Sequence, residues 1–295
     1  NGGFSGNRDG APRRAVCGSP ADFGRPMTHA STSMTYEFTA RTDKGRVRSN
    51  NEDAVAVDRD AQVAILADGM GGYNAGEVAS GMATTFIRTE MARWLAQAGA
   101  SPQSTDVRRA LEICVENANH AILGASLSNP QYAGMGTTLV VAVFHGSRLI
   151  LGHIGDSRCY RLRDGGLQQI TRDHSWLQEQ VDAGLLTAQQ AALSSNRNLV
   201  TRALGVEPNV LMEVNEFQVA PNDLFLLCSD GLTDMVSDSD LAELVRAPMP
   251  LEEKATLLID TANANGGRDN VSALLVQAAA GGKKRGLMSR LLGAS

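Results

Sequence analysis

Short apolar runs bounded by Gly, Asp or Asn recur along most of the chain, and they predict β-strands. The expected strands cover residues 35–41, 54–58, 62–68, 137–144, 148–156, 158–162, 213–219, 224–230 and 271–277. Many of these runs follow one another directly, which is typical of antiparallel strands joined by turns.

Three segments switch to the period of an amphipathic helix. The first two lie between the third and fourth strands, and their apolar faces consist of Val78, Met82, Phe86, Ile87, Met91, Trp94 and Leu95, and of Val107, Leu111, Cys114, Val115, Ala118 and Ile122. The third covers about residues 251–264 and ends at Gly266, a residue suited to a helix C-terminus. Directly connected strands with helices inserted in pairs disfavour a doubly wound parallel sheet and predict an α+β layered sandwich.

The pattern also divides the chain into regions. Residues 1–33 are rich in Gly, Pro, Ser and Arg, and we expect a disordered extension or an artificial leader there. The folded domain is expected at residues 34–278, with a surface flap at about 174–200, where neither period holds. Residues 279–295 predict a basic flexible tail, with a docking or membrane-surface peptide as the alternative.

Composition narrows the classes of function. A chain of 295 residues with 43% hydrophobic content can bury one sizeable core. Its net charge of −5 gives no large cationic face, which argues against nucleic acid as a partner. The four cysteines form no CxxC pair, no stretch approaches the roughly 18 apolar residues of a membrane span, and the first residues lack the apolar segment of a signal peptide. We therefore expect a cytoplasmic monomer with no transmembrane segment.

Acidic residues stand at the ends of several expected strands. The stretch ILADGMGGYNAGE, residues 65–77, ends a strand at Asp68 and spends three of the next four residues on glycine before it becomes helical. Comparable acids occur at Asp53, which follows Glu52, and at Asp156, Asp230 and Asp269. Five such acids could converge at one end of a sandwich.

Two explanations of these acids stay open. Singly, an Asp before Gly is most often a turn or helix-capping residue, and Asp68 and Asp230 both precede helical stretches. Jointly, clustered carboxylates repel one another unless a cation neutralises them, and their oxygens suit Mg²⁺ or Mn²⁺. Gly69 would let the backbone approach such an ion, because it has no Cβ.

Arg48 lies close in sequence to Asp53 and is the candidate phosphate ligand. A guanidinium group can bind two phosphate oxygens at once. The ordinary alternative is a solvated arginine in a polar loop. Beside a metal cluster, Arg48 indicates a phosphate substrate.

Eight ordered motifs resemble those of the metal-dependent protein serine/threonine phosphatases, the PP2C or PPM family, in its bacterial form. They are VRSNNEDA, ADGMGG, AGMGTTLV, GDSRCYRL, TRDHS, NLVTRALG, LLCSDGLTD and GGRDNVS, spread over about residues 35–277. The resemblance implies a four-layer αββα sandwich, in which two antiparallel sheets are flanked by antiparallel helix pairs. It also implies Mn²⁺ or Mg²⁺ as the cofactor, with two ions per active site and a third, weaker site.

The family pattern implies a role for each acid. Asp68 would bridge two ions, and the Gly69 carbonyl would bind one of them. Asp230 and Asp269 would hold the other ion.

The remaining positions of the pattern concern water, the weaker site and the substrate. Asp53 would act largely through metal-bound water, and Asp156 would form the third site together with Asp230. Arg48 matches the position that binds the substrate phosphate.

The implied reaction is hydrolysis of phosphoserine and phosphothreonine in proteins. A hydroxide shared by two ions would attack phosphorus directly, with no covalent phosphoenzyme. Arg48 and the ions would neutralise the phosphoryl oxygens, and Cys159 and Cys228 would be core residues. The implied partners are phosphorylated proteins, including a bacterial eukaryotic-like Ser/Thr kinase whose action the enzyme would oppose.

The sequence departs from the family at the proton donor. Met70 stands where eukaryotic members have a proposed acid histidine, and Tyr73 stands where many bacterial members have His. A metal-bound water is the preferred donor and His174 a second candidate, although a His in such a turn is more often structural. His153 is expected to be a packing residue. Residues 194–198, SSNRN, replace the His and Pro that relatives often carry in the flap.

Two other functions remain as alternatives. A catalytically silent regulatory module would keep the fold but usually loses a metal acid, and all five acids are present. A metal-dependent esterase for small phosphates, such as a nucleotide phosphodiesterase, usually carries His-rich metal sites, which this chain lacks. Parallel assays on a phosphopeptide and a nucleotide would separate the second alternative.

Overall fold

Two antiparallel β-sheets face each other in the part of the chain that the computed structural model describes, residues 34–72, 75–99, 101–192, 194 and 199–281. The expected leader at 1–33, Tyr73, most of the SSNRN segment and most of the basic tail lie outside the described residues. The first strand begins at Met34, and the last one continues to Ala280, slightly beyond the expected domain end at 278.

The strands are divided between two sheets, each with its own strand order. The first sheet has the order β1 (Met34–Asp43), β11 (Val271–Ala280), β10 (Leu224–Cys228), β7 (Arg158–Arg163), β8 (Gly166–Gln169). The second has the order β2 (Asp53–Asp58), β3 (Val63–Met70), β5 (Leu139–His145), β6 (Arg148–Ile154), β9 (Glu213–Gln218), and the short β4 (Gly136–Thr137) pairs with the end of β3. All the strand pairs are antiparallel.

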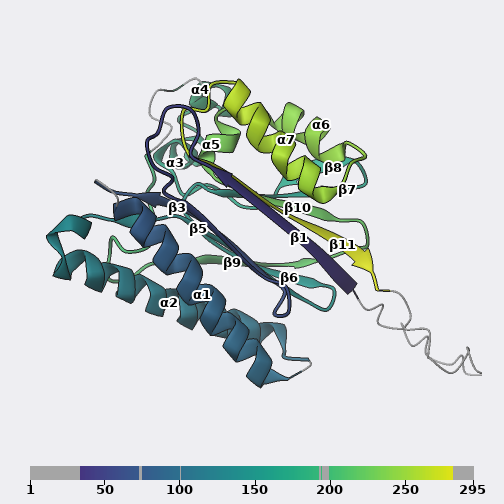
Figure 1. Cartoon of the computed structure of the whole chain (residues 1–295), viewed down its shortest axis with the longest axis horizontal. Coiled ribbons are helices and arrows are strands. Elements are labelled where there is room, and N and C mark those ends of the chain that lie inside the picture. Colours follow the sequence, from purple (N-terminus) through teal and green to yellow (C-terminus); the bar gives the residue numbers. More distant parts are fainter. Residues whose placement is uncertain (1–33, 73–74, 100, 193, 195–198, 282–295) are drawn as a thin grey trace, which may run out of the picture. The chain divides into compact units, whose positions relative to one another are not determined.

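Helices cover the outer face of each sheet (Figure 1). The second sheet packs against α1 (Ala75–Ala98) and α2 (Ser104–Ser128), and the 3-10 helix η1 (Pro130–Tyr132) follows them. The first sheet packs against α5 (Asp230–Thr233), α6 (Asp238–Arg246) and α7 (Leu251–Ala264). The predicted flap contains α3 (Trp176–Asp182) and α4 (Ala188–Ala192).

Three apolar clusters hold these layers together. One lies under α1 and α2, one lies under α6 and α7, and the third fills the space between the sheets. In the third, the rings of Phe38, Phe144 and Phe225 contact one another, with centroids 5.4 Å apart for Phe144 and Phe225. Three cores between four layers confirm the predicted αββα sandwich.

The structure differs from the prediction made from the sequence at several elements. The expected strand 137–144 is two strands, β4 and β5, separated at Thr138. The Thr138 hydroxyl accepts the Asp68 N–H at 3.0 Å and contacts the Ser157 hydroxyl at 2.8 Å, and these contacts occupy the break. β8 and α6 were not predicted, whereas the helical stretch expected after Asp230 is α5, which begins at Asp230 itself. None of the helices in the described residues is long and apolar enough to span a membrane.

Candidate active site

The acids of the strand ends meet because neighbouring antiparallel strands place the start of one beside the end of the next. Asp53 at the start of β2 is the register partner of Asp68 near the end of β3. Asp230 follows β10, and Asp269 precedes the neighbouring β11. Asp156 follows the end of β6. Three acids thus come from the second sheet and two from the first, all at the same end of the sandwich.

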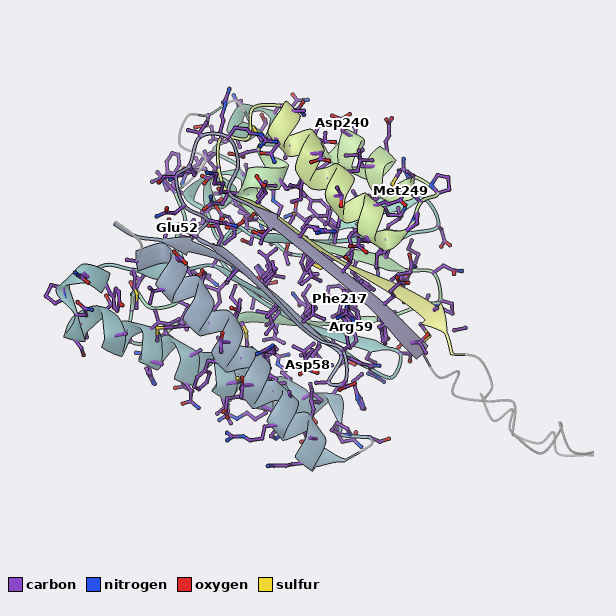
Figure 2. The ribbon with its side chains drawn as sticks, viewed as in Figure 1. Glu52, Asp58, Arg59, Phe217, Asp240 and Met249 are labelled. Atoms are coloured by element: carbon purple, nitrogen blue, oxygen red, sulfur yellow. The ribbon has the colours of Figure 1, made fainter. Side chains whose placement is uncertain are left out.

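A cavity of about 350 Å³ opens at this end of the sandwich. Glu52, labelled in Figure 2, lines it directly before β2. Its other lining residues include Arg48, Asp68, Gly69, Asp156, Asp230 and Asp269. The cavity therefore gathers the expected phosphate ligand and four of the five expected metal acids.

Asp53 lies beneath the cavity and is 7% exposed. The Ser229 hydroxyl donates to its Oδ2 at 2.7 Å, which ties β2 to the other sheet. Its Oδ1 is buried without a hydrogen-bond partner among the described residues. Burial raises the pKa of Asp53 to about 6, and the Ser229 bond opposes that rise. An orphaned buried carboxylate oxygen is the kind of group that a cation or a cation-bound water satisfies.

Asp68 and Gly69 occupy a crowded stretch of β3. Burial and the neighbouring carboxylates of Asp53, Asp230 and Asp156 raise the pKa of Asp68 well above its usual value. A Cβ on Gly69 would lie 2.1 Å from the carbonyl oxygen of Gly76 in α1. Only glycine lets the backbone pass there.

The capping explanation does not apply to Asp68. The residue lies inside β3, which continues to Met70, and α1 begins only at Ala75. Asp230 is the first residue of α5, whose N-cap position is held by Ser229. Neither acid is therefore the N-cap of a helix.

Arg48 pairs with an acid of the same site. Its Nη2 donates to Asp269 Oδ2 at 2.7 Å, and its side chain is 53% exposed. This hydrogen bond, more than any other contact, raises the pKa of Arg48. The guanidinium is thus charged, accessible and held at the mouth of the cavity.

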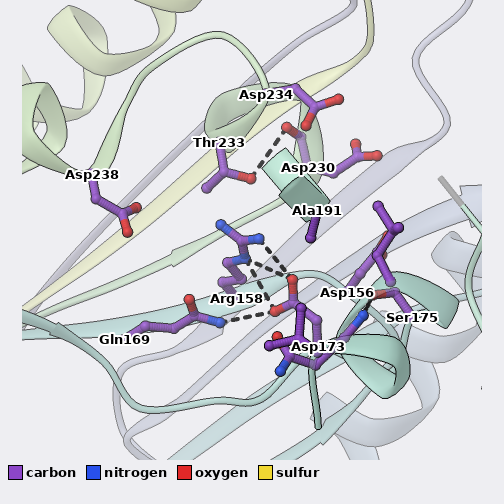
Figure 3. A pocket seen from close by; sticks show the side chains of 13 residues that line it. Asp156, Arg158, Gln169, Asp173, Ser175, Ala191, Asp230, Thr233, Asp234 and Asp238 are labelled. Atoms are coloured by element: carbon purple, nitrogen blue, oxygen red, sulfur yellow. Dashed lines mark hydrogen bonds and ion pairs between the residues drawn. The ribbon is translucent and has the colours of Figure 1, made fainter. Parts of the chain in front are cut away.

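A second cavity of 360 Å³ adjoins the first, and Asp156 and Asp230 line both (Figure 3). Asp156 is 9% exposed, and burial followed by the charge of Asp173 raises its pKa to about 6. Burial and the charge of Asp156 raise the pKa of Asp230 well above its usual value. Asp156 and Asp230 therefore lie where the two cavities meet.

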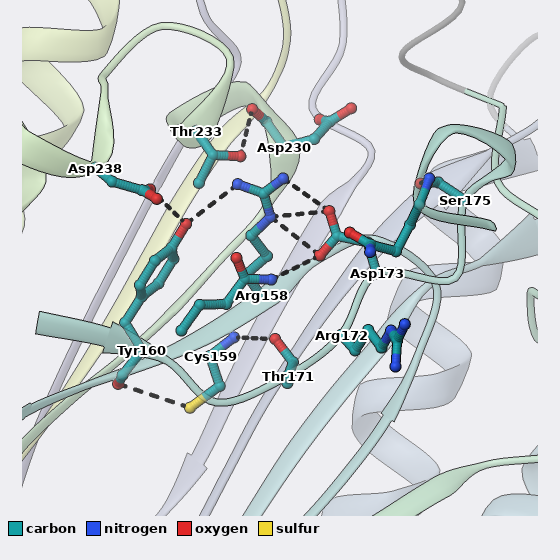
Figure 4. A network of polar contacts seen from close by, with 12 residues as sticks. Arg158, Cys159, Tyr160, Thr171, Arg172, Asp173, Ser175, Asp230, Thr233 and Asp238 are labelled. Carbon is teal, nitrogen blue, oxygen red and sulfur yellow. Dashed lines mark hydrogen bonds and ion pairs between the residues drawn. The ribbon is translucent and has the colours of Figure 1, made fainter. Parts of the chain in front are cut away.

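An ionic network supports the side of this cavity (Figure 4). Arg158 Nε lies 3.1 and 3.0 Å from the two carboxylate oxygens of Asp173, and its Nη2 donates to Oδ2 at 2.7 Å. Gln169 donates to Asp173 at 2.8 Å, and the Tyr160 hydroxyl donates to Asp238 at 2.9 Å. The network fixes β7 against the segment that leads into the flap, and it neutralises Asp173 locally.

The two histidines named from the sequence lie together and do not line the cavity of the acids. The rings of His153 and His174 stack with centroids 4.5 Å apart, and Glu213 completes a group whose ligand atoms lie within 4.8 Å of one another. His174 Nδ1 accepts the Gly155 N–H at 3.2 Å, so a neutral ring carries its proton on Nε2, which faces Glu213 at 3.6 Å. Because Nδ1 accepts a hydrogen bond, a metal bound to Nε2 would require an imidazolate, a ring with no proton on either nitrogen.

Burial, followed by the charges of His153 and Arg202, lowers the pKa of His174 to about 4. The ring is therefore neutral near pH 7 and engaged with the backbone of Gly155. His174 is a structural residue in this arrangement and lies away from the cavity lining.

The cavity of the acids, in contrast, fits a divalent cation. Asp68, Asp156, Asp230 and Asp269 line it, and Asp53 lies beneath it. Its donors are all oxygens, several of its carboxylates have raised pKa values, and Asp53 Oδ1 has no partner among the described residues. Mutual repulsion of this kind is relieved when cations bind. Gly69 also lines the cavity.

Sequence reasoning missed residues that hold these acids in place. Ser229 bonds Asp53, and its hydroxyl accepts the Ser272 N–H at 3.0 Å. Asn270 accepts the Glu52 N–H at 2.7 Å. Ser229 and Asn270 each adjoin an aspartate of the site in sequence, and this adjacency is the signal that could have indicated them.

Comparisons with known proteins agree with this geometry. The family model described as protein phosphatase 2C matches residues 42–275. The serine/threonine phosphatase stp of Listeria monocytogenes serotype 4b is 38% identical over 247 residues, which are 83% of this chain and 96% of that protein.

Solved structures are similar as well. The catalytic domain of the serine/threonine protein phosphatase PstP, in complex with two manganese ions, has a TM-score of 0.74 at 38% identity and covers 84% of this chain and 100% of that one. The phosphatase Stp1 from Staphylococcus aureus has a TM-score of 0.77 at 31% identity and covers 88% and 99%.

Proposed function

This chain belongs to the protein phosphatase 2C family, and from that premise we propose that it hydrolyses phosphoserine and phosphothreonine in proteins. The observation that carries the proposal is the single cavity that gathers aspartates from both sheets beside Arg48. Carboxylates bind cations, and the guanidinium binds phosphate. The named activity of the similar bacterial phosphatases supports the same substrate class.

We propose that two divalent ions, Mn²⁺ or Mg²⁺, bind among these acids. Asp68 would bridge them, the Gly69 carbonyl would bind one, and Asp230 and Asp269 would bind the other. The two manganese ions of the similar PstP structure support this number. When bound, the ions would neutralise the carboxylates and lower the pKa of water in the cavity, and hydrolysis would then need no covalent phosphoenzyme.

The outer ligands follow from the same geometry. Asp53, buried and fixed by Ser229, would act through water on its free oxygen. Asp156 and Asp230, which line both cavities, would form the third and weaker cation site.

The chain's own residues orient the substrate. Arg48 would exchange Asp269 for the phosphate oxygens and hold them as charge shifts during the transfer. Met70 lines the cavity but has no proton to give, and His174 is buried behind it. We propose that the leaving group takes its proton from water in the cavity.

We propose phosphorylated proteins as the partners, including a bacterial Ser/Thr kinase that the enzyme opposes. Similar bacterial proteins carry the name serine/threonine phosphatase. The monomeric state, the cytoplasmic location and the domain bounds at 34–278 stay predictions.

The test of the proposed function removes one acid. We expect Asp230→Asn to lower the kcat for p-nitrophenyl phosphate and for a phosphothreonine peptide at least about 100-fold, because charge stabilisation at the cavity is lost. Excess EDTA should have the same effect on the unaltered protein. Asp60→Asn, at an exposed acid of the β2–β3 turn, is the matched control and should keep full activity.

Persistent turnover in Asp230→Asn or in EDTA would contradict the proposed mechanism. A protein that binds Mn²⁺ but never hydrolyses a phosphopeptide would be the silent module. Hydrolysis of nucleotides in preference to phosphopeptides would favour the small-phosphate esterase. Circular dichroism of the variant confirms that the fold is kept.

A further inference from the structure

A groove with a partly apolar lining lies directly beside the catalytic cavity. It has a volume of 430 Å³, and we call it the rim groove. Its apolar lining residues are Met70, Val200, Ala203, Val206, Val210 and Leu211, and its polar ones are Thr201, Arg202, Glu207 and Asn209. Met70 and Val200 also line the catalytic cavity, so the two hollows share a wall. A molecule that fills one can therefore continue into the other.

Large apolar side chains are exposed to solvent in the rim groove and at its border with the catalytic cavity. Leu211 is 72% exposed, Val206 is 54% exposed, and Leu199 at the edge of the catalytic cavity is 52% exposed. These are three of the eight large apolar side chains that are exposed among the described residues. Such clustering beside a site is typical of a binding surface rather than of scattered surface residues.

The backbone beneath these side chains is held firmly. Asn119 of α2 is fully buried; its Oδ1 accepts the Gly205 N–H at 2.7 Å, and its Nδ2 donates to the Glu207 carbonyl at 2.9 Å. Leu204 exchanges two backbone hydrogen bonds with Thr137 of β4, at 2.8 and 3.1 Å. The exposed side chains are thus presented by a fixed loop.

The orientation of Leu211 follows from its neighbours. Val210 and Met212 on either side both pack against the core under α1 and α2, and Leu211 between them faces away. A Cβ on Gly152 would lie 2.6 Å from the Met212 sulfur, which shows how closely Met212 fits over β6. The two anchored neighbours keep Leu211 in solvent.

We propose that the rim groove binds an apolar side chain of the phosphoprotein substrate, on one flank of the phosphorylated residue. The inference rests on the proposed function. A substrate that places its phosphate at Arg48 must lead its chain out across the cavity wall, and the groove continues that wall. None of the side chains that line the second cavity is among the large exposed apolar ones of the described residues, so the rim groove is the flank that can take an apolar side chain.

The first experiment varies the peptide. Phosphothreonine peptides of equal charge carry a single Leu at each position within about four residues of the phosphothreonine, roughly 13 Å of extended chain, and are compared with a peptide that has Ser throughout. We expect at least one Leu position to raise kcat/KM about 5- to 10-fold, mainly through KM, because an apolar side chain leaves water. Equal kcat/KM for every peptide would overturn the inference.

The second experiment varies the enzyme. In Val206→Ser/Leu211→Ser, the kcat/KM ratio of the preferred Leu peptide to the all-Ser peptide should fall to about one, with p-nitrophenyl phosphate as the reference substrate. Leu127→Ser, at an exposed leucine of α2 away from the groove, is the matched control and should keep the wild-type ratio. Retention of the preference in the double variant would also overturn the inference.

The outcomes separate this inference from the proposed function. If the unaltered protein hydrolyses no phosphopeptide, the proposed function fails first. If it hydrolyses them all equally, only the rim groove inference fails. Light scattering shows whether the groove instead joins two copies of the chain, in which case the double variant would change the molar mass and the inference would be wrong.

Discussion

Arg48 shows how one residue can be prepared for a ligand by an acid of the same site. Its guanidinium is half exposed and bound to Asp269, so it has a definite position before substrate arrives. If Arg48 binds the substrate phosphate as proposed, the same bond has to be released or shared when a phosphate group enters. Arg48 would then act through its fork of donors as well as through its charge.

We expect Arg48→Ala to lower kcat/KM for a phosphothreonine peptide about 10- to 100-fold, because charge-assisted hydrogen bonds to phosphate are lost. Arg48→Lys should restore only part of this, since an ammonium group cannot bind two oxygens in the same plane. Steady-state kinetics on both variants provide the measurement.

Arg41→Ala is the matched control. Arg41 also pairs with an acid at 2.7 Å, Glu252, but away from the cavity. Its loss should leave the kinetics unchanged. Equal effects of Arg41→Ala and Arg48→Ala would contradict a specific role for Arg48.

At the residue scale, the acids could be predicted from the sequence, whereas the long-range contacts of the residues that support them could not. Asp68, Asp156, Asp230 and Asp269 each end or begin an apolar run, a local signal. The bond from Ser229 to Asp53 joins residues 176 positions apart, and no local pattern encodes that distance. The structural role of His174 likewise depends on Gly155, which only the fold brings near.

At the scale of elements, α2 links the second sheet to the loop that forms the rim groove. The buried Asn119 side chain makes hydrogen bonds to Gly205, Glu207 and Pro208. A buried polar group of this kind stabilises one loop conformation, because the alternatives leave backbone groups unpaired.

We expect Asn119→Ala to lower the free energy of unfolding by about 2–3 kcal/mol, since it leaves buried backbone groups without partners. Urea unfolding monitored by circular dichroism provides the measurement. Asn117→Ala, at an exposed asparagine of the same helix, should change stability by less than about 0.5 kcal/mol. A similar loss in both variants would contradict a specific role for the loop contact, because alanine favours a helix more than asparagine does and would not destabilise it by propensity.

Element periodicity predicted α1, α2 and α7 and most strands, because these elements bury one regular face. β8 was missed because Gly166–Gln169 has no apolar alternation and is defined by its pairing with β7. The available signal was the Asp-Gly pair at Asp164 and Gly165, which is typical of a hairpin turn. In the structure both residues have positive φ values, 50° and 78°. The break at Thr138 depends on distant partners and has no such signal.

At the scale of the whole molecule, the acids come from both sheets, so their charges repel across the seam between the sheets. In the metal-free protein the pKa values of Asp53 and Asp156 are raised by burial from 3.8 to about 6. The folded state therefore binds protons more tightly than the unfolded state. Stability from this source is fully present below pH 3.8 and is lost as the pH rises through about 6.

We expect the thermal unfolding midpoint in EDTA to rise by about 3–6 °C when the pH is lowered from about 7.5 to about 5.5. Excess Mn²⁺ should raise the midpoint at the higher pH and remove this trend, because ions replace protons as the neutralising charge. Differential scanning calorimetry provides the measurement.

Asp53→Asn is the control for this pH dependence, because it removes one of the responsible carboxyl groups. Its midpoint in EDTA should depend less on pH than that of the unaltered protein. A midpoint in EDTA that falls on acidification over this range would contradict the assignment.

The pairing of β1 with β11 places Met34 opposite Ala280, while Asp43 at the other end lies opposite Val271, two residues after Asp269. Both ends of the described domain therefore leave one corner of one sheet, a ten-residue strand away from the cavity, roughly 33 Å. A short linker could close the chain into a ring there, and new termini could open in an exposed turn elsewhere. Fusion partners attached at either end would start far from the entrance that a phosphoprotein uses.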